Sequence, residues 1–147
     1  TLESLGISSE VSGGLGEVGL CAKIEEDLSL MDTDEAKEFR EAMGLDEPAV
    51  ERVKQVCYST VGLVSFLTVG EDECRAWPVP AGIVAQMAAG TIHTDFTRGF
   101  IRAEVIAYDD LIRCGSLVQG RKEGVLRSEG KTYEVKDGDV INFLINT

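Results

Sequence analysis

The sequence has few side chains that bind metals and no long apolar segment. It contains one histidine and four cysteines (Cys21, Cys57, Cys74 and Cys114), and no two cysteines form a CxxC pair. A zinc site needs such ligands at close spacing, so we expect no metal site. We expect the cysteines to be free thiols in a reducing compartment. No apolar run approaches the roughly 20 residues of a membrane-spanning helix, and the first residues lack a signal-peptide pattern. We therefore expect a cytoplasmic protein with no membrane contact.

Positive charge is also scarce. The chain has 14 Lys and Arg residues against 26 Asp and Glu, a net charge of −12. The excess is concentrated in residues 1–64, with 14 acidic and 5 basic side chains, against 12 and 9 in residues 65–147. Because Lys and Arg hold a phosphate backbone, we expect RNA contact only through a local patch or inside a larger assembly.

The hydrophobic period changes near residue 62. Apolar residues recur at helical spacing before it, in segments 24–31, 35–43 and 50–61, and we expect Glu17–Ala22 to form a short buried strand. After it, alternation predicts strands at 63–69, 74–79, 101–107, 125–128, 132–135 and 140–145, and a short helix at 83–89 that ends at Gly90. Pro78 cannot donate to a sheet ladder, which places its strand at an edge. The pattern predicts an α+β fold in which a small sheet grips one helix, a β-grasp.

Two glycine patterns resemble phosphate-binding loops. Gly14–Gly19 fits G-x-G-x-x-G, but the expected order of a loop before it and a strand after it is wrong for a dinucleotide site. Gly115–Lys122 nearly spells a P-loop, but its lysine is one place late and Glu123 follows where a hydroxyl is needed. We expect no site for triphosphate chemistry in this chain.

The single histidine, His93, lies two residues before Asp95. The pair could be a catalytic base with its partner, a metal site, or a structural turn between a helix and a strand. No nucleophile is identifiable nearby, so a structural turn or partner contact is favoured. Trp77 could pack on the sheet or offer a platform for a base, and Arg98 and Arg102 could bracket an anionic partner or simply be solvated.

Several blocks together resemble one family, the YchF group of Obg-like ATPases, at its carboxy-terminal end. The blocks are Arg75-Ala76-Trp77, Ala88 to Phe96 (AAGTIHTDF), Gly99 to Val105 (GFIRAEV), Tyr108-Asp109-Asp110, and Lys136 to Val140 (KDGDV). The resemblance covers residues 63–147 and extends more weakly back to about residue 17. Pro78, where the family usually has threonine, and Gln86-Met87, where it usually has Pro-Gln, depart from the pattern.

The resemblance implies two parts: residues 63–147 as a TGS domain with a β-grasp (ubiquitin-like) fold, and residues 1–62 as a mostly helical remnant of a P-loop α/β nucleotide-binding domain. In that remnant Cys21, Ala22 and Lys23 match the loop beside the nucleotide base, where the Ala22 N–H would border the base. His93, Asp95, Arg98, Arg102 and Trp77 are candidate partner contacts. No catalytic or metal-binding residue is expected in this chain.

We therefore expect a carboxy-terminal fragment of a ribosome-associated ATP- or GTP-binding protein acting in translation. Its TGS domain would dock on the parent's nucleotide-binding domain and on the ribosome, through the large subunit or the 70S particle, with RNA contacted only there. ATP or GTP and Mg²⁺ would be bound, and nucleotide hydrolysed, by the parent and not by this chain. The alternative is a stand-alone TGS module that binds RNA or a small nucleotide. A sulfur-carrier β-grasp protein is disfavoured, because the sequence ends in Leu144-Ile145-Asn146-Thr147 rather than Gly-Gly.

Overall fold

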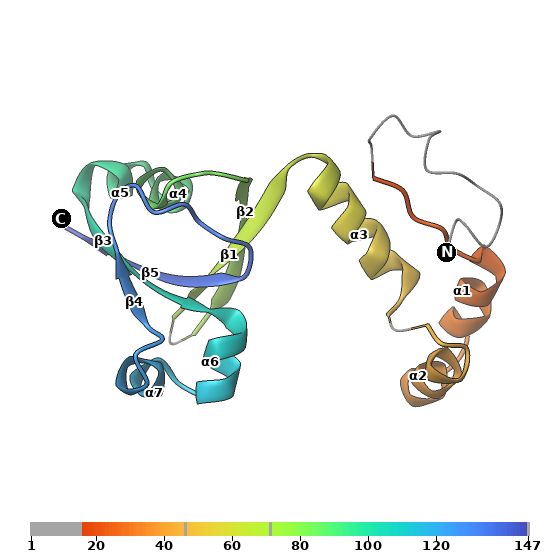
Figure 1. Cartoon of the computed structure of the whole chain (residues 1–147). Coiled ribbons are helices and arrows are strands. Elements are labelled where there is room, and N and C mark those ends of the chain that lie inside the picture. Colours follow the sequence, from red (N-terminus) through yellow and green to blue (C-terminus); the bar gives the residue numbers. More distant parts are fainter. Residues whose placement is uncertain (1–15, 46, 71, 147) are drawn as a thin grey trace. The chain divides into compact units, whose positions relative to one another are not determined.

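The computed structural model describes residues 16–45, 47–70 and 72–146 (Figure 1). The chain divides into two compact units between Val61 and Gly62. In the described residues the first unit is entirely helical outside its loops, and the second contains the sheet. None of the helices in these ranges is long and apolar enough to cross a membrane.

The described part of the first unit contains three helices: α1 (Ala22–Ser29), α2 (Thr33–Ala42) and α3 (Ala49–Thr60). The Asp32 carboxylate caps α2 by accepting hydrogen bonds from the N–H groups of Asp34 and Glu35, at 3.1 and 2.9 Å. A small core forms around Leu28, Ala36 and Ala49, which are 4–6% exposed.

The strand expected over Glu17–Ala22 is wrong. Residues 16–20 are irregular, Cys21 is the N-cap of α1, and Ala22 is its first helical residue. A strand needs a neighbour for its backbone groups, and the part of this unit that the structure describes has none. The Gly19 carbonyl instead accepts a hydrogen bond from the Arg52 guanidinium at 2.8 Å. Gly14 and Leu15 of the first glycine pattern lie outside the described residues.

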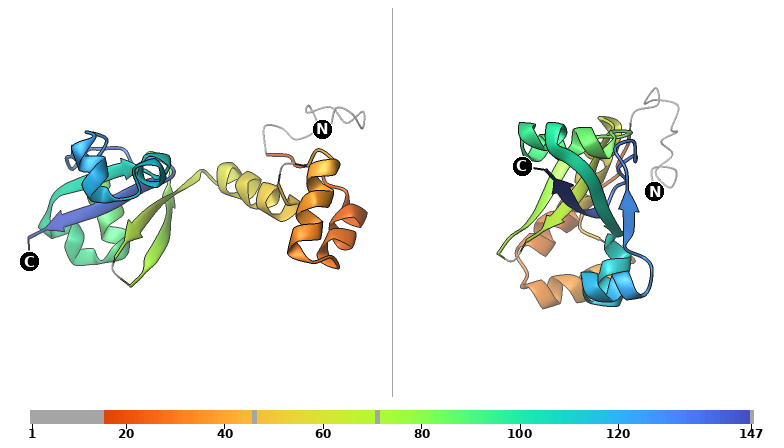
Figure 2. Two further views of the ribbon diagram at one scale, coloured as in Figure 1. Left: turned by 90° about the horizontal axis from the view of Figure 1, so that it is seen from below. Right: turned by 90° about the vertical axis from the view of Figure 1, so that its left-hand side faces the viewer.

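The second unit is a five-stranded sheet with helices on both faces (Figures 1 and 2). The strand order is β2-β1-β5-β3-β4, with β1 and β5 parallel and the other neighbours antiparallel. Its strands are β1 (Leu63–Val69), β2 (Cys74–Pro80), β3 (Phe100–Ala107), β4 (Arg127–Glu129) and β5 (Asp139–Ile145). Its helices are α4 (Ala85–Ile92), α5 (Thr94–Gly99), α6 (Tyr108–Cys114) and α7 (Leu117–Lys122). The expected edge position of the strand with Pro78 is confirmed.

Small side chains let α4 lie close to the sheet. Ala85, Ala88 and Ala89 are fully buried, and they pack in one core with side chains from one sheet face, among them Phe66, Val79, Val105 and Ile141. Helices α6 and α7 lie on the other face (Figure 2). There a Cβ at Gly120 of α7 would come within 2.6 Å of the Ile106 Cδ1 atom, so a larger residue would require the Ile106 side chain to shift.

Two local expectations for this unit are wrong. Thr132–Val135 is not a strand of the sheet, because Tyr133 and Val135 pair instead with the segment before α4: the Ala85 N–H donates to the Tyr133 carbonyl at 2.7 Å and the Val135 N–H donates to the Ile83 carbonyl at 3.0 Å. Gly90 does not end α4, which continues to Ile92. Its place is explained by packing, since a Cβ there would collide with the Thr97 hydroxyl.

Candidate docking groove at the end of β1

His93 stands between α4 and α5 and forms the N-cap of α5. Its Nδ1 atom accepts a hydrogen bond from the Asp95 N–H at 3.3 Å and lies 3.6 Å from the Asp95 carboxylate. These roles exclude each other, because an Nδ1 atom that accepts a hydrogen bond carries no proton for an ion pair. Both side chains are well exposed, at 60% and 76%. In this geometry His93 holds the start of a short helix.

Trp77 lies on the edge strand β2 and contacts three side chains. Its indole Nε1–H donates to the Thr68 hydroxyl at 3.0 Å, and its ring stacks with Phe66 at a centroid separation of 6.4 Å. The Arg75 guanidinium lies 4.2 Å from the ring centroid, a cation–π distance. The ring is thus held on the sheet by neighbours on β1 and β2.

A groove of about 290 Å³ lies beside neighbours of both residues. We call it the β1–β5 groove, and it is lined by Thr68, Val69, Gly70, Glu73, Ile92, Phe96, Ile141, Asn142 and Phe143. His93 adjoins one wall, because its ring lies 5.9 Å from that of Phe96, and Trp77 adjoins another through its bond to Thr68. His93 and Trp77 thus each have a neighbour in the lining of the groove, but neither of them lines it.

The two predicted arginines do not line this groove. Arg98 is exposed in the last turn of α5. Arg102 is exposed on β3, where the neighbouring Ala103 is buried in the core beneath α4, so alternation along the strand directs Arg102 to the opposite sheet face. The five predicted contact residues are thus distributed over more than one surface.

Cys21, Ala22 and Lys23 form the beginning of α1 rather than a loop. The Ala22 N–H is one of the first amides of a helix, which have no acceptor within the helix. The Lys23 ammonium pairs with Glu26 at 2.9 Å and Asp27 at 3.0 Å, and these hydrogen bonds, first that of Glu26, raise the pKa of Lys23. This lysine is already paired within its own helix.

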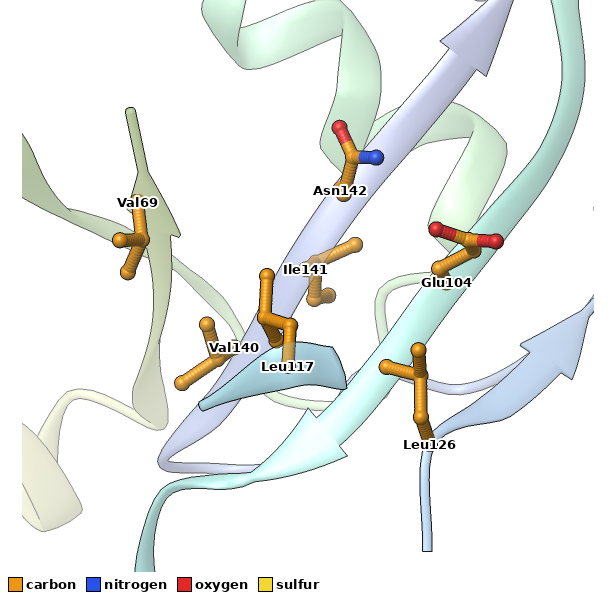
Figure 3. Close-up of a pocket in the computed structure, with 7 residues that line it drawn as sticks. All are labelled: Val69, Glu104, Leu117, Leu126, Val140, Ile141 and Asn142. Atoms are coloured by element: carbon orange, nitrogen blue, oxygen red, sulfur yellow. The ribbon is translucent and has the colours of Figure 1, made fainter. Parts of the chain in front are cut away.

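Two further hollows are poor candidates for a nucleotide. The cavity between α7 and the sheet has a volume of about 10 Å³, room for one water molecule at most (Figure 3). An open hollow of about 500 Å³ is lined by Ala107, Asp110, Gly124, Val125, Arg127, Lys136, Asp137 and Asp139. Because this lining contains both cations and carboxylates, a phosphate there would meet charges of both signs. Within the described ranges, no three His, Cys, Asp or Glu side chains are placed to hold a metal ion.

Comparison with known proteins identifies the family of the chain. Residues 63–146 match the family model YchF-GTPase_C, described as a protein of unknown function (DUF933). The chain belongs to the YchF family. It is 45% identical over 129 residues to a protein named "Ribosome-binding ATPase YchF" from Escherichia coli O157:H7, an alignment that covers 88% of this chain and 36% of the relative. A relative of the same name from Bacillus subtilis is 43% identical over 127 residues, covering 86% of this chain and 35% of the relative.

A solved structure agrees with this assignment. The structure of the Schizosaccharomyces pombe YchF GTPase matches with a TM-score of 0.76 and 29% identity, over 90% of this chain and 35% of that one. This chain therefore spans about a third of the length of the YchF proteins that it matches. The mixed α+β architecture is that of the carboxy-terminal part of the YchF fold.

The KDGDV block of the YchF family forms the turn into β5, and its two aspartates have roles that sequence reasoning missed. The Asp137 carboxylate accepts a hydrogen bond from the Ser65 N–H of β1 at 2.7 Å. Asp139 is only 3% exposed, and its Oδ2 atom accepts bonds from the Tyr133 hydroxyl at 2.8 Å and the Lys136 N–H at 2.9 Å. Burial, followed by the bond to Asp139, raises the pKa of Tyr133. The Asp-Gly pair predicted a turn, but no local signal identified its distant partners.

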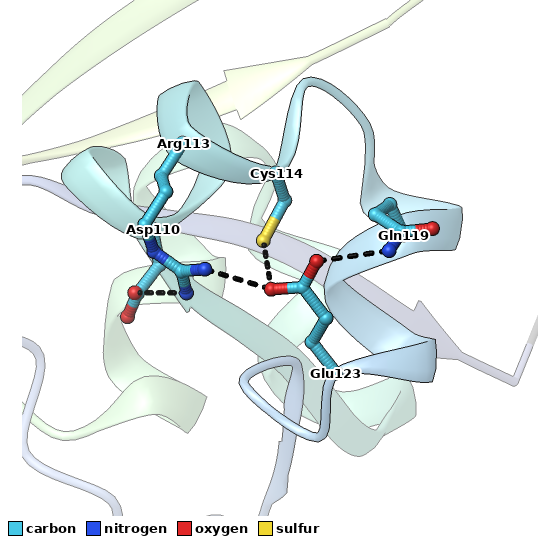
Figure 4. A network of polar contacts seen from close by, with 5 residues as sticks. All are labelled: Asp110, Arg113, Cys114, Gln119 and Glu123. Carbon is cyan, nitrogen blue, oxygen red and sulfur yellow. Dashed lines mark hydrogen bonds and ion pairs between the residues drawn. The ribbon is translucent and has the colours of Figure 1, made fainter.

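The near-P-loop segment of this YchF chain forms the corner between α6 and α7. Gly115 ends α6 at φ +74°, and the Ser116 hydroxyl caps α7 by accepting from the Gln119 N–H at 3.1 Å. Glu123 accepts bonds from the side chains of Gln119, Arg113 and Cys114 (Figure 4). These bonds, that from Gln119 first, lower the pKa of Glu123 to about 2. The segment is built around this carboxylate.

Proposed function

We propose that this chain is the carboxy-terminal part of a ribosome-associated ATP- or GTP-binding protein of the cytoplasm, and that its second unit is a docking and regulatory module. This proposal rests on the match of residues 63–146 to the YchF family and on relatives that are named ribosome-binding ATPases. Because the chain spans 36% of such a relative, hydrolysis of nucleotide with Mg²⁺ is assigned to other parts of the parent protein.

The second unit is proposed to be a TGS domain with a β-grasp fold. Support comes from the parallel pairing of β1 with β5 at the centre of the sheet and from α4, which crosses the face that holds Phe66 and Ile141. A central parallel pair with antiparallel strands on each side and one packed helix is the arrangement that the term describes.

The first unit is proposed to complete a P-loop nucleotide-binding domain, with Cys21, Ala22 and Lys23 beside the base. The N–H of Ala22 is at the start of α1, where amides have no acceptor within the helix, and it would donate to a base edge. Apolar side chains in these helices or at their ends are exposed: Leu30, the C-cap of α1, is 82% exposed, Val50 in α3 56%, and Val61, the C-cap of α3, 67%. Such exposure fits a unit that packs against further protein of the parent.

The contact with the ribosome is proposed to use the surfaces that carry Trp77, His93, Asp95, Arg98 and Arg102. Arg98 and Arg102 are exposed cations in an otherwise acidic chain, so they are the groups suited to ribosomal phosphates. RNA would be bound in that context alone.

Co-sedimentation of the chain with 70S ribosomes and with isolated large subunits tests this proposal. We expect saturable binding that falls at least tenfold in the double variant Arg98→Ala/Arg102→Ala. The matched control Lys122→Ala/Lys131→Ala removes the same charge from exposed positions elsewhere in the unit and should bind normally. Equal loss in both variants would show that binding follows net charge and would contradict the assigned surface.

Nucleotide assays separate the proposal from the alternative of a stand-alone module. The chain alone should show no Mg²⁺-dependent ATP or GTP hydrolysis above buffer, and robust turnover would overturn the proposal. Saturable binding of a nucleotide or an RNA oligomer without ribosome binding would favour the stand-alone TGS module.

A further inference from the structure

The sheet of the second unit has a third open edge in addition to its two outer strands. The parallel register pairs Leu67 of β1 with Val140 of β5, so Val69, where β1 ends, is level with Asn142. Residues 143–145 continue β5 beyond that point. They pair with β3 on one side, and on the other side no strand of the described ranges faces them. The β1–β2 hairpin diverges from β5 at this point (Figure 2).

The two outer edges are protected against further strands, whereas this inner edge is not. On β2, Pro78 and Pro80 provide no N–H donors to a neighbouring strand. β4 is three residues long and carries the charged side chains of Arg127 and Glu129. Short edges, prolines and charges are the usual devices against strand addition. Residues 143–145 read Phe-Leu-Ile: this edge is as short as β4, but it contains neither a proline nor a charged side chain.

The β1–β5 groove lies along this open edge. Ile92 and Phe96 from the helical side, together with Val69 and Phe143 from the strands, provide apolar lining. The charged group in the lining is Glu73, and the exposed Asp72 precedes it at the hairpin tip. The groove thus combines an unpaired strand edge, an apolar wall and an acidic rim.

We propose that this edge binds an extended basic segment of a partner protein, which adds to the sheet beside residues 143–145. Backbone hydrogen bonds to β5 would hold the segment, as in other cases of strand addition. Every second side chain of the segment would face Ile92 and Phe96, so apolar residues are expected at alternating positions. A lysine or arginine of the segment would approach Glu73, in agreement with the acidic rim.

Selection from a phage-displayed library of random seven-residue peptides tests this proposal without assuming a partner. On the immobilised chain we expect enrichment of peptides with alternating apolar residues and at least one Lys or Arg. Their binding should weaken at least tenfold in Asp72→Lys/Glu73→Lys. The control Asp109→Lys/Glu134→Lys reverses the same number of exposed charges outside the groove and should bind as the wild type. No enrichment, or equal binding by both variants, would overturn the proposal.

Amide hydrogen exchange followed by NMR tests the backbone contact directly. In the free chain, amides of residues 143–145 that point to the open edge should exchange rapidly, while those bonded to β3 exchange slowly. A selected peptide should slow the open-edge amides at least tenfold. Protection that appears along β2, or no change at residues 143–145, would overturn the proposal even if a peptide binds.

Discussion

The Asp137 carboxylate accepts a hydrogen bond from the Ser65 backbone N–H at 2.7 Å, across 72 positions of sequence. The adjacent Gly138 N–H donates to the Ser65 carbonyl at 2.9 Å, so the turn before β5 is joined to β1 by two bonds. This contact aligns the parallel pair at the centre of the sheet.

The variant Asp137→Ala should therefore lower the free energy of unfolding by about 1–2 kcal/mol, since a hydrogen bond to a charged group is lost at a partly solvated site. Urea unfolding followed by circular dichroism measures the loss. Asp109→Ala, an exposed aspartate of the same unit, is the control and should change stability little. Equal losses in both variants would contradict the role given to the Ser65 contact.

Gly120→Ala should destabilise the second unit by about 1–3 kcal/mol, because the new methyl group must displace Ile106 in a packed core. Gly130→Ala is the matched control, since a Cβ there meets no atom within 4 Å. Thermal unfolding compares the two variants. Adding Ile106→Val to Gly120→Ala should recover part of the loss, and failure to do so would contradict the proposed collision.

The stabilising contribution of Glu123 should depend on pH. Its pKa lies near 2 in the folded chain, below its ordinary value of 4.5, so the contribution is complete above about pH 4.5 and is lost as the pH falls through about 2. The difference in unfolding free energy between wild type and Glu123→Gln should therefore shrink between about pH 6 and about pH 2.5. It should also shrink at high salt, because these side chains are exposed. A difference that is constant over this pH range would contradict the prediction.

Tyr133→Phe should remove one hydrogen bond to the buried Asp139 carboxylate and cost about 1–3 kcal/mol. Tyr108→Phe, at an exposed tyrosine, should cost little. The ultraviolet absorbance of ionised phenol offers a second readout. Because the pKa of Tyr133 is raised above its ordinary value of 10.0, the wild type should show a late-titrating component that Tyr133→Phe lacks. A titration curve unchanged apart from amplitude would contradict this assignment.

Alternation and turn residues predicted most of the second unit from sequence. β1 and β5 follow the expected apolar periods, and Pro78 correctly indicated an edge strand. The family blocks predicted YchF membership from sequence, and the family match confirms it. These features depend on residues that are close in sequence, which is why local reasoning could find them.

The errors concern features that depend on distant neighbours. Glu17–Ala22 has the composition of a strand but no partner strand in the described residues, and Tyr133–Val135 pairs with the segment before α4 instead of joining the sheet. The β1–β5 groove was also not predicted, because it results from the parallel register of two strands more than 70 residues apart. No sequence period reports such a register.

The position of β5 has a consequence for the synthesis of the protein. This strand is the last of the described chain, yet it is the middle one of the sheet and separates β1–β2 from β3–β4. In a nascent polypeptide that ends before Asp139, the β1–β2 and β3–β4 pairs have no common neighbour, so their apolar faces stay exposed to water until β5 has left the ribosomal tunnel. Closure of this unit therefore requires β5, and a chain truncated before Asp139 should be insoluble rather than a slightly shorter version of the folded unit.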